Sequence, residues 1–499
     1  FDKTTLNDFQ IDISKRLVTE IRNRIKYLSD VGLGYLTLNR KSNTLSGGES
    51  QRINLATSLG SSLVGSMYIL DEPSIGLHPK DTNKLIDVLK NLRDLGNTVI
   101  VVEHDDAIMK ASDYIIDIGP EAGSFGGQVV GEGNYNSIVK QNTLTAKYLN
   151  KEFKIEIPKK RRKSNKLVKM KGCRANNLKN IDVDFPLDSL VAVTGVSGSG
   201  KSTLVKNILY PALNNKLIGY GDKPGEFDGI FGNIDSINFV EFVDQNPIGR
   251  SSRSNPVTYI KAYDEIRSLF SNQRLSKIRD YQPKHFSFNV DGGRCPSCKG
   301  EGIVTIEMQF MADVKLKCES CKGKRFKDSI LEIKFEGKNI DDILNMTIDQ
   351  ALMFFESNEC KKIKNKLQPL QDVGLGYVTL GQSSSTLSGG EAQRIKLAAF
   401  LGKGSQSTSG LFIFDEPTTG LHFHDIKKLL KSFDALIEIG HSIVVIEHNL
   451  ELIKSADYII DLGPEGGQKG GQIMTCGTPE DLINNKTSTT GAHLKKVLN

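Results

Sequence analysis

One glycine-rich segment of the chain has the composition and spacing of a phosphate-binding loop. Residues 195–202 match the pattern G-x-x-x-x-G-K-[ST] between an apolar run and a probable helix start. The glycines let backbone N–H groups close around phosphate oxygens, and the helix N-terminus adds a partial positive charge. Lys201 would neutralise the β- and γ-phosphates of a nucleotide, and Ser202 would ligate Mg²⁺. The predicted phosphate site comprises Gly195, Val196, Ser197, Gly198, Ser199, Gly200, Lys201, Ser202 and Thr203.

Two carboxylates and one histidine have the spacing needed to hydrolyse a nucleotide at that loop. Asp415 and Glu416 follow the apolar run 411–414, the pattern of a buried strand that ends in two acids. Asp415 would hold Mg²⁺, mostly through water, and Glu416 would polarise the attacking water. His448 ends the next apolar run and would contact the γ-phosphate. A lone histidine is usually structural, but His104 has the same sequence context, which favours a functional role.

Two further glycine pairs could present backbone donors to an anion. Residues 46–49 and 388–391 both read Ser-Gly-Gly-Glu, and each opens a predicted helix. Their glycines permit close backbone approach, and their N–H groups can face a phosphate. By itself this sequence is a common capping turn. Its occurrence in one chain with a P-loop and an Asp-Glu-Pro strand makes it a specific indicator of a nucleotide site. Ser46, Gly47 and Gly48 are therefore predicted to contribute to nucleotide binding.

Four of the seven cysteines form two C-x-x-C pairs. Cys295 and Cys298 make the first pair and Cys318 and Cys321 the second, with nineteen residues between the pairs. This spacing fits a four-thiolate tetrahedral Zn²⁺ site. A redox dithiol is the alternative, but two paired knuckles exceed what a redox motif needs. Four protein ligands leave no open position, so the predicted zinc is structural. Residues 303–310 and 314–317 between the pairs could form a hairpin.

An internal repeat indicates which elements position these groups. Residues 31–60 and 373–402 are closely similar, and both contain Val-Gly-Leu-Gly-Tyr and Leu-Ser-Gly-Gly-Glu. After each come Asp-Glu-Pro, Gly-Leu-His, a strand ending in Glu-His, and Asp-Tyr-Ile-Ile-Asp. Duplication on this scale implies two copies of one α/β nucleotide-binding fold. Helical spacing marks 391–401 and 425–439, and buried parallel strands are predicted at 67–70, 99–102, 190–194, 411–414 and 443–446.

The two copies differ in what precedes them, because the P-loop lies upstream of the second repeat and no equivalent precedes the first. We therefore predict that residues 1–150 are the C-terminal half of a first nucleotide-binding domain. Residues 151–166 are predicted to be a basic linker, and 167–499 a complete second domain. An inserted signature domain is expected at 251–372, with the zinc module at about 285–330.

Composition and charge restrict the class of protein. Hydrophobic residues make up 38% and charged residues 25%, which is typical of globular proteins. No run of about 18 apolar residues occurs, so no membrane helix is predicted. The net charge of +6 is modest, but residues 151–171 hold ten Lys and Arg against two Glu, and 261–327 are also basic. These stretches could meet a phosphate backbone or be solvated surface. The cysteine usage favours a reducing cytoplasm.

Taken together, these residues resemble the UvrA family, the damage-recognition ATPase subunits of the bacterial nucleotide-excision-repair nuclease. The resemblance is carried by 195–203, by 243–259 (VDQNPIGRSSRSNPVTY), by the cysteine module and by both signature blocks. It implies two ABC-type nucleotide-binding domains, the first truncated, with helical signature domains and a zinc-binding insertion. The implied cofactors are ATP, Mg²⁺ and Zn²⁺, and the implied activity is an ATPase without nuclease chemistry. Gln245 would sense Mg²⁺ and γ-phosphate, and Arg250, Arg253 and Lys284 would lie near DNA.

The resemblance also implies partners. Family members form homodimers, bind distorted duplex DNA and load UvrB, a helicase-like subunit. The family's first P-loop, partner-binding domain and first zinc module would lie upstream of Phe1, so we expect the C-terminal portion of a longer protein. Asp71, Glu72 and His104 would then belong to a site without its P-loop in this chain. The P-loop 195–202 would be completed by signature 45–49, as in related ABC ATPases.

Two other functions remain open at this stage. A transporter's ATPase subunit would also carry a P-loop and a signature, although a zinc module and a fused second copy disfavour it. A non-hydrolysing, ATP-switched DNA-binding scaffold is the other possibility, and the presence of Glu416 and His448 disfavours it.

Overall fold

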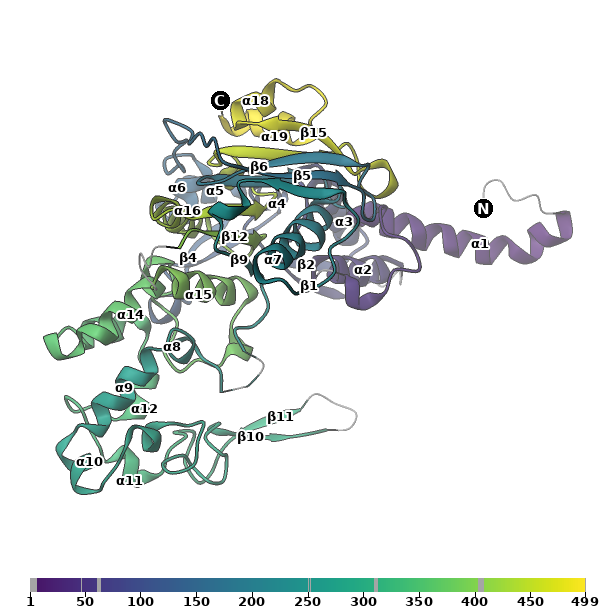
Figure 1. The fold of residues 1–499 in the computed structure, drawn as a ribbon. Helices are drawn as coiled ribbons and strands as arrows, with labels where there is room; N and C mark the ends of the chain where they lie inside the picture. Colours follow the sequence, from purple (N-terminus) through teal and green to yellow (C-terminus); the bar gives the residue numbers. More distant parts are fainter. Residues whose placement is uncertain are drawn as a thin grey trace.

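The computed structural model describes residues 7–45, 47–60, 64–249, 251, 253–308, 313–402 and 408–498. A central body contains the strands of both repeats (Figure 1). Helix α1 (Asp8–Leu28) extends from one side of this body, and an arm of short helices with a β-hairpin extends from the other. None of the helices within those ranges combines the length and apolar character needed to cross a bilayer.

A six-stranded sheet forms the centre of the second repeat. Its order is β15-β14-β7-β13-β12-β9, and every neighbouring pair is parallel except β14 and β15. All residues of β7 and β13 are buried, as expected for continuous apolar runs in a sheet covered on both faces. The strands are β7 (Leu190–Gly195), β9 (Phe239–Val243), β12 (Gly410–Asp415), β13 (Ser442–Ile446), β14 (Tyr458–Gly463) and β15 (Gln472–Gly477).

Helices and a smaller antiparallel sheet surround this six-stranded sheet. The small sheet has the order β6-β5-β8 and packs its apolar side chains with those of β7, α7 and β12 into one core. Its strands are β5 (Leu167–Cys173), β6 (Ile181–Pro186) and β8 (Gly229–Gly232). The helices are α7 (Tyr210–Ile218), α15 (Gly389–Leu401), α16 (Phe423–Glu438), α17 (Leu450–Ile453), α18 (Pro479–Asn484) and α19 (Thr489–Leu498).

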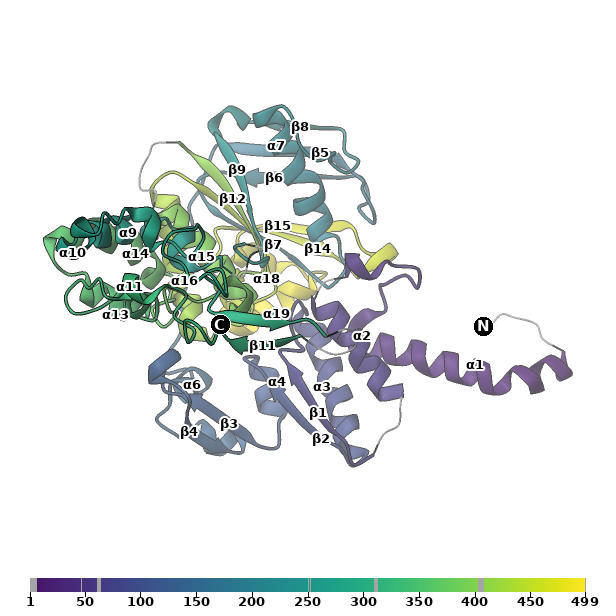
Figure 2. The same ribbon diagram turned by 90° about the horizontal axis from the view of Figure 1, so that it is seen from below.

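The first repeat contains the counterparts of most of these elements. A parallel pair β1-β2 corresponds to β12-β13, and an antiparallel pair β3-β4 corresponds to β14-β15. The two pairs lie apart in Figure 2, and no strand within the described residues joins them as β7 joins β13 to β14. The elements are β1 (Met67–Asp71), β2 (Thr98–Val102), β3 (Ile115–Gly119), β4 (Gln128–Gly133), α2 (Gly47–Gly60), α3 (Pro79–Asp94), α4 (Asp106–Ala111), α5 (Tyr135–Ile138) and α6 (Leu144–Leu149).

The predicted burial of the first-repeat strands is wrong in one respect. Residues 67–70 and 99–102 do form parallel strands, but their side chains alternate between partly buried and exposed positions. Ile69 is 68% exposed and Val102 is 50% exposed. A continuous apolar run predicts cover on both faces. Here the described residues cover only one face, on which α3 packs.

The arm between β9 and α15 contains the cysteine module. Its helices bury apolar residues in the same core as the second repeat, so the arm is continuous with that half. A β-hairpin, β10 (Ile303–Ile306) and β11 (Val314–Lys317), projects from the arm (Figure 1). Residues 309–312 of the predicted hairpin lie outside the described residues. The helices are α8 (Pro256–Tyr259), α9 (Ala262–Ser271), α10 (Arg274–Ile278), α11 (Asp328–Leu331), α12 (Ile340–Leu344), α13 (Ile348–Phe354) and α14 (Lys361–Asp372). The domain boundaries given above stay a prediction.

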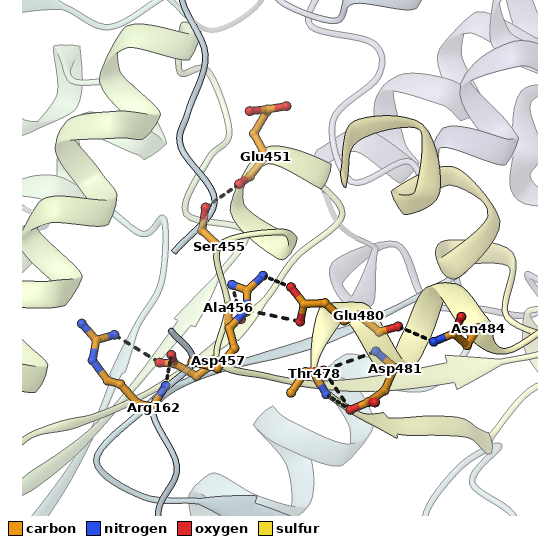
Figure 3. Close-up of polar contacts among 10 residues, drawn as sticks. Arg162, Glu451, Ser455, Ala456, Asp457, Thr478, Glu480, Asp481 and Asn484 are labelled. Atoms are coloured by element: carbon orange, nitrogen blue, oxygen red, sulfur yellow. Dashed lines mark hydrogen bonds and ion pairs between the residues drawn. The ribbon is translucent and has the colours of Figure 1, made fainter. Parts of the chain in front are cut away.

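Two arginines of the basic linker are bound to acids of the second repeat. Arg161 Nη2 lies 2.7 Å from a carboxylate oxygen of Glu480. Arg162 donates to Asp457 through its backbone N–H at 2.8 Å and its guanidinium at 3.1 Å (Figure 3). The same carboxylate accepts the Leu190 N–H at the start of β7. These contacts favour an internal role for this part of the basic stretch over phosphate binding.

Candidate active site

The P-loop has the strand–loop–helix setting that the sequence predicts. It follows β7, and Gly195, Gly198 and Gly200 have φ values of +130°, +73° and +109°, which L side chains rarely adopt. Lys201 is buried, and its Nζ donates to the carbonyl oxygens of Gly195 and Val196, both at 3.0 Å. Burial lowers the pKa of Lys201 from its usual value. The ammonium therefore lies over the loop in which phosphate oxygens would bind.

Glu416 lies at the carboxyl end of β12 and faces the first repeat. Its backbone has a φ of +48°, in the left-handed region that L side chains rarely adopt. A Cβ at Gly76 of the first repeat would lie 3.0 Å from Glu416 Oε1. Burial raises the pKa of Glu416, and the charges of Asp415 and Glu447 raise it further. A carboxylate in this setting is a stronger base than an exposed one, which suits proton transfer from water.

His448 is buried and neutral beside the P-loop. Its Nδ1 has no hydrogen-bond partner among the described residues. Burial is the main cause that lowers the pKa of His448 well below its usual range. The charge of Lys201 lowers this pKa further, as would a charge on His78. Glu447 fixes the loop, because its carboxylate accepts the N–H of His448 at 2.6 Å and that of Thr418 at 3.0 Å. An unpaired ring nitrogen is thus available for a polar ligand.

Gln245 contacts the loop that carries Glu416. Its Nε2 donates to the backbone oxygen of Glu416 at 3.2 Å and to Thr419 Oγ1 at 3.1 Å. A Cβ at Gly389 of the second signature would lie 3.1 Å from the Gln245 Cβ. Gln245 therefore connects the Glu416 loop with the second signature, at a position from which it could sense the state of the site.

Tyr35, which precedes the first signature in the chain, lies against the P-loop of the second repeat. A Cβ at Gly198 would lie 2.5 Å from the ring of Tyr35, so the two segments are in direct contact. The Tyr35 hydroxyl donates to Glu49 in the first turn of α2 at 2.5 Å. A Cβ at Gly47 would meet nothing within 4 Å, which leaves space beside this helix N-terminus. Ser46 lies outside the described residues. Tyr35 thus connects the first turn of α2 with the P-loop of the second repeat.

The predicted catalytic residues and their counterparts in the first repeat line a single cavity between the repeats. Its volume is about 1040 Å³, and its lining includes Glu72 and His104 from the first repeat with Glu416 and His448 from the second. Burial and nearby acids raise the pKa of Glu72 to about 7. A Cβ at Gly420 would lie 3.1 Å from Glu72 Oε1, which mirrors the contact of Gly76 with Glu416. The two repeats are therefore related by an approximate twofold arrangement.

The four cysteines are brought together as the sequence predicts. All four Sγ atoms lie within 4.8 Å of one another. The Sγ atoms of Cys295 and Cys318 are 3.9 Å apart, and those of Cys298 and Cys321 are 3.6 Å apart. Tetrahedral Zn–S bonds of about 2.3 Å require sulfur separations of about 3.8 Å, so the donor set fits zinc. Lys299 and Lys322 follow the second cysteine of each pair with φ near +50°. The Gly302 N–H donates to Cys298 Sγ at 3.2 Å, which stabilises a thiolate.

The residues expected near DNA are only partly available for it. Arg250 lies outside the described residues. The Arg253 guanidinium lies 3.4 Å from a Glu301 carboxylate oxygen and is 25% exposed. Lys284 is exposed on the arm. Of the described pair, Lys284 is the better placed to meet a phosphate.

Several residues at the interface between the repeats were not identified from the sequence. They occur at matching positions in both repeats, and this repetition was the sequence signal that could have identified them. These residues are Tyr35 and Tyr377, His78 and His422, Glu103 and Glu447, and Asp117 and Asp461.

Comparisons with known proteins point to one family, although no protein-family model matches the chain. The chain is 54% identical over 500 residues to UvrABC system protein A of Staphylococcus epidermidis, covering 100% of this chain and 52% of that protein. It is 56% identical over 488 residues to the protein of the same name from Clostridium perfringens, covering 97% of this chain and 52% of that protein. The crystal structure of UvrA2 from Deinococcus radiodurans aligns with a TM-score of 0.92 at 40% identity, over 99% of this chain and 59% of that one. The chain thus spans about half the length of the curated relatives it matches.

Proposed function

We propose that the chain belongs to the UvrA family of ABC-type ATPases and that it binds and hydrolyses ATP between its two repeats to control DNA-damage recognition. The observation that carries this proposal is the contact between Tyr35 and Gly198. Because Tyr35 also donates to Glu49 in the first signature, this contact supports a composite site between the signature of one repeat and the P-loop of the other within a single chain. In this arrangement, ATP would be enclosed by both repeats, and its hydrolysis would allow them to separate.

Each residue of the composite site has a distinct role in the proposal. Lys201 leaves its two loop carbonyls to neutralise the β- and γ-phosphates. Glu416 orients the attacking water and accepts its proton, and His448 contacts the γ-phosphate from the opposite side of the loop. The backbone N–H groups of Gly47 and Gly48 face the charge that develops on the phosphate. Ser202 and Asp415 would hold Mg²⁺, which would offset the charge of the phosphates.

We propose that the cysteine module holds one structural Zn²⁺. Cys295, Cys298, Cys318 and Cys321 would supply all four ligands, which leaves no position for a reacting molecule. The metal would fix the base of the β10-β11 hairpin, whose strands carry exposed lysines such as Lys315 and Lys317.

The proposal also assigns partners. The relatives are named as protein A of a UvrABC system. We propose that the chain acts in the cytoplasm as part of a homodimer on damaged duplex DNA and passes that DNA to a UvrB-type subunit. The basic arm with Lys284 and the lysine-bearing hairpin supports DNA as the ligand. Nuclease chemistry is not assigned to this chain.

The experiment measures ATP turnover by the purified chain without DNA, with undamaged duplex and with duplex carrying a helix-distorting lesion. We expect the lesion-bearing duplex to change the turnover rate more than the undamaged duplex does. ATP binding without turnover would indicate a switched scaffold. Turnover that is insensitive to any DNA would contradict DNA recognition as the role and would be consistent with a transporter subunit.

A further inference from the structure

A buried histidine of the first repeat is bound to the last helix of the second. His78 is fully buried at the N-terminal cap of α3, where its Nδ1 accepts the N–H of Lys80 at 3.2 Å. Burial is the largest cause that lowers its pKa, to about 3, so the ring is neutral. The proton of a neutral ring must then be on Nε2. That nitrogen lies 3.2 Å from Thr490 Oγ1 in α19 and donates to it.

The hydrogen-bond chain continues to a strand beside the P-loop. The Thr490 hydroxyl donates to Asp461 Oδ1 at 2.9 Å, and the Ser488 hydroxyl donates to Asp461 Oδ2 at 2.6 Å. Asp461 is 1% exposed and pairs in register with Thr194, the residue that precedes the P-loop. His78 Nε2, Thr490 and Asp461 therefore form an oriented relay from one repeat to the nucleotide-binding strand of the other.

His78 also contacts the P-loop and approaches His448. Its backbone N–H points to Ser197 Oγ at 3.4 Å, and the Ser197 hydroxyl donates to the carbonyl of Gly76 at 3.3 Å. The rings of His78 and His448 meet edge to face with centroids 6.1 Å apart. One residue of the first repeat thus contacts α19, the P-loop and His448 of the second repeat.

The approximate twofold arrangement supplies a matched counterpart. His422 Nε2 lies 3.4 Å from Thr145 Oγ1, and the Thr145 hydroxyl donates to Asp117 Oδ1 at 2.9 Å. The rings of His104 and His422 have centroids 6.4 Å apart. The counterpart has the same contacts between repeats, but no P-loop within the described residues adjoins it. A purely structural role would make the two histidines equivalent, whereas a role in turnover would not.

We propose that His78 is a positioning residue for ATP hydrolysis, which holds α19, the P-loop and His448 in the arrangement required for turnover. The inference rests on the proposed function of the composite site and adds a residue supplied by the opposite repeat. His78 acts through its hydrogen bond to Thr490 and its packing on His448, without touching the nucleotide. Loss of the relay lowers kcat more than it weakens nucleotide binding, because the P-loop itself is unchanged.

The test compares His78→Leu with the matched variant His422→Leu in the full chain. Steady-state kcat and KM for ATP are measured, together with the affinity for a non-hydrolysable ATP analogue. His78→Leu should lower kcat about 10–100-fold with KM changed by less than about threefold, whereas His422→Leu should change kcat by less than about threefold. His78→Gln should recover part of kcat, because its amide N–H can replace the donor to Thr490.

A second variant isolates the relay from packing. Thr490→Val removes only the hydroxyl, and it serves as the primary variant if His78→Leu does not fold. Adding His78→Leu to Thr490→Val should lower kcat no further, because Thr490→Val already removes the hydrogen bond from His78 as well as the one to Asp461. Equal losses of kcat in His78→Leu and His422→Leu, or an effect confined to KM, would overturn the inference about His78 and leave the proposed function intact. Absence of turnover in the unmutated chain would overturn the proposed function and the inference with it.

Discussion

Replacing Glu416 by glutamine separates the charge of this side chain from its shape. The variant keeps the backbone oxygen that accepts from Gln245, and it retains nearly the same volume beside Gly76. Glu72 offers a matched control, because it has the equivalent position beside Gly420 and its pKa is also raised, to about 7. Both carboxylates line the same cavity, but of the two only Glu416 is close enough to the P-loop for the charge of Lys201 to act on it.

The size of the effect follows from the proposed role. A positioned general base contributes about 10²–10⁴-fold to a rate, which is about 3–5 kcal/mol of barrier at 1.36 kcal/mol per tenfold. Burial and neighbouring acids raise the pKa of Glu416, so turnover by the unmutated chain should increase as pH rises and this group loses its proton. Removing the carboxylate also removes repulsion toward the triphosphate, so ATP binding should be retained or strengthened.

The assay measures steady-state turnover and ATP affinity for Glu416→Gln, Glu72→Gln and the unmutated chain. Glu416→Gln should lose about 10²–10⁴-fold of turnover with ATP affinity at least retained, and Glu72→Gln should lose less than about threefold. The reasoning is refuted if Glu416→Gln keeps its turnover, or if Glu72→Gln is equally damaging.

Three further predictions concern the phosphate loop, the metal and the pH dependence of stability. Lys201→Ala should weaken ATP binding about 10–150-fold and abolish turnover, since a charge-assisted hydrogen bond contributes about 1.5–3 kcal/mol. Unchanged turnover would contradict the assignment of Lys201 to the ATP site. Metal analysis should find about one Zn²⁺ per chain, lost in Cys298→Ser; four freely titrating thiols in the unmutated chain would contradict this. The folded-state pKa of Glu72 is raised above its unfolded value, so its ionisation destabilises the fold as pH rises toward and above about 7. Glu72→Gln should therefore raise the melting temperature at about pH 8 but not at about pH 4, and equal shifts would count against the raised pKa.

The groups that could be predicted from the sequence are those whose chemistry is encoded in a short contiguous pattern. The P-loop needs glycines at fixed places in one turn, and the structure gives Gly195, Gly198 and Gly200 positive φ values. The cysteine knuckles are likewise local, and their Sγ atoms lie together. Asp415 and Glu416 end a buried strand as expected, because a run of apolar residues is readily recognised as a strand.

The contacts between the repeats could not be derived in this way, because they depend on how two folded halves meet. Tyr35 and Gly198 are far apart in the chain, and nothing local in either segment specifies their contact. The hydrogen bond from His78 to Thr490 joins opposite ends of the chain for the same reason. The exposure of Ile69 was also not predicted. An apolar sequence indicates that a strand favours burial, but it does not indicate which other segments cover the two faces of that strand.

The composite site is tested most directly by ATP turnover in Gly47→Asp, with nucleotide affinity measured in parallel. A Cβ at Gly47 meets nothing within 4 Å, so the variant should fold, but its carboxylate would enter the space left for the phosphate. Gly389 is not a suitable control, because a side chain there would press on Gln245. We predict that turnover falls about a hundredfold while ATP affinity changes much less, because backbone donors aimed at the developing charge contribute a few kcal/mol each. Undiminished turnover in Gly47→Asp would contradict the claim that the first signature completes the ATP site at the P-loop of the second repeat.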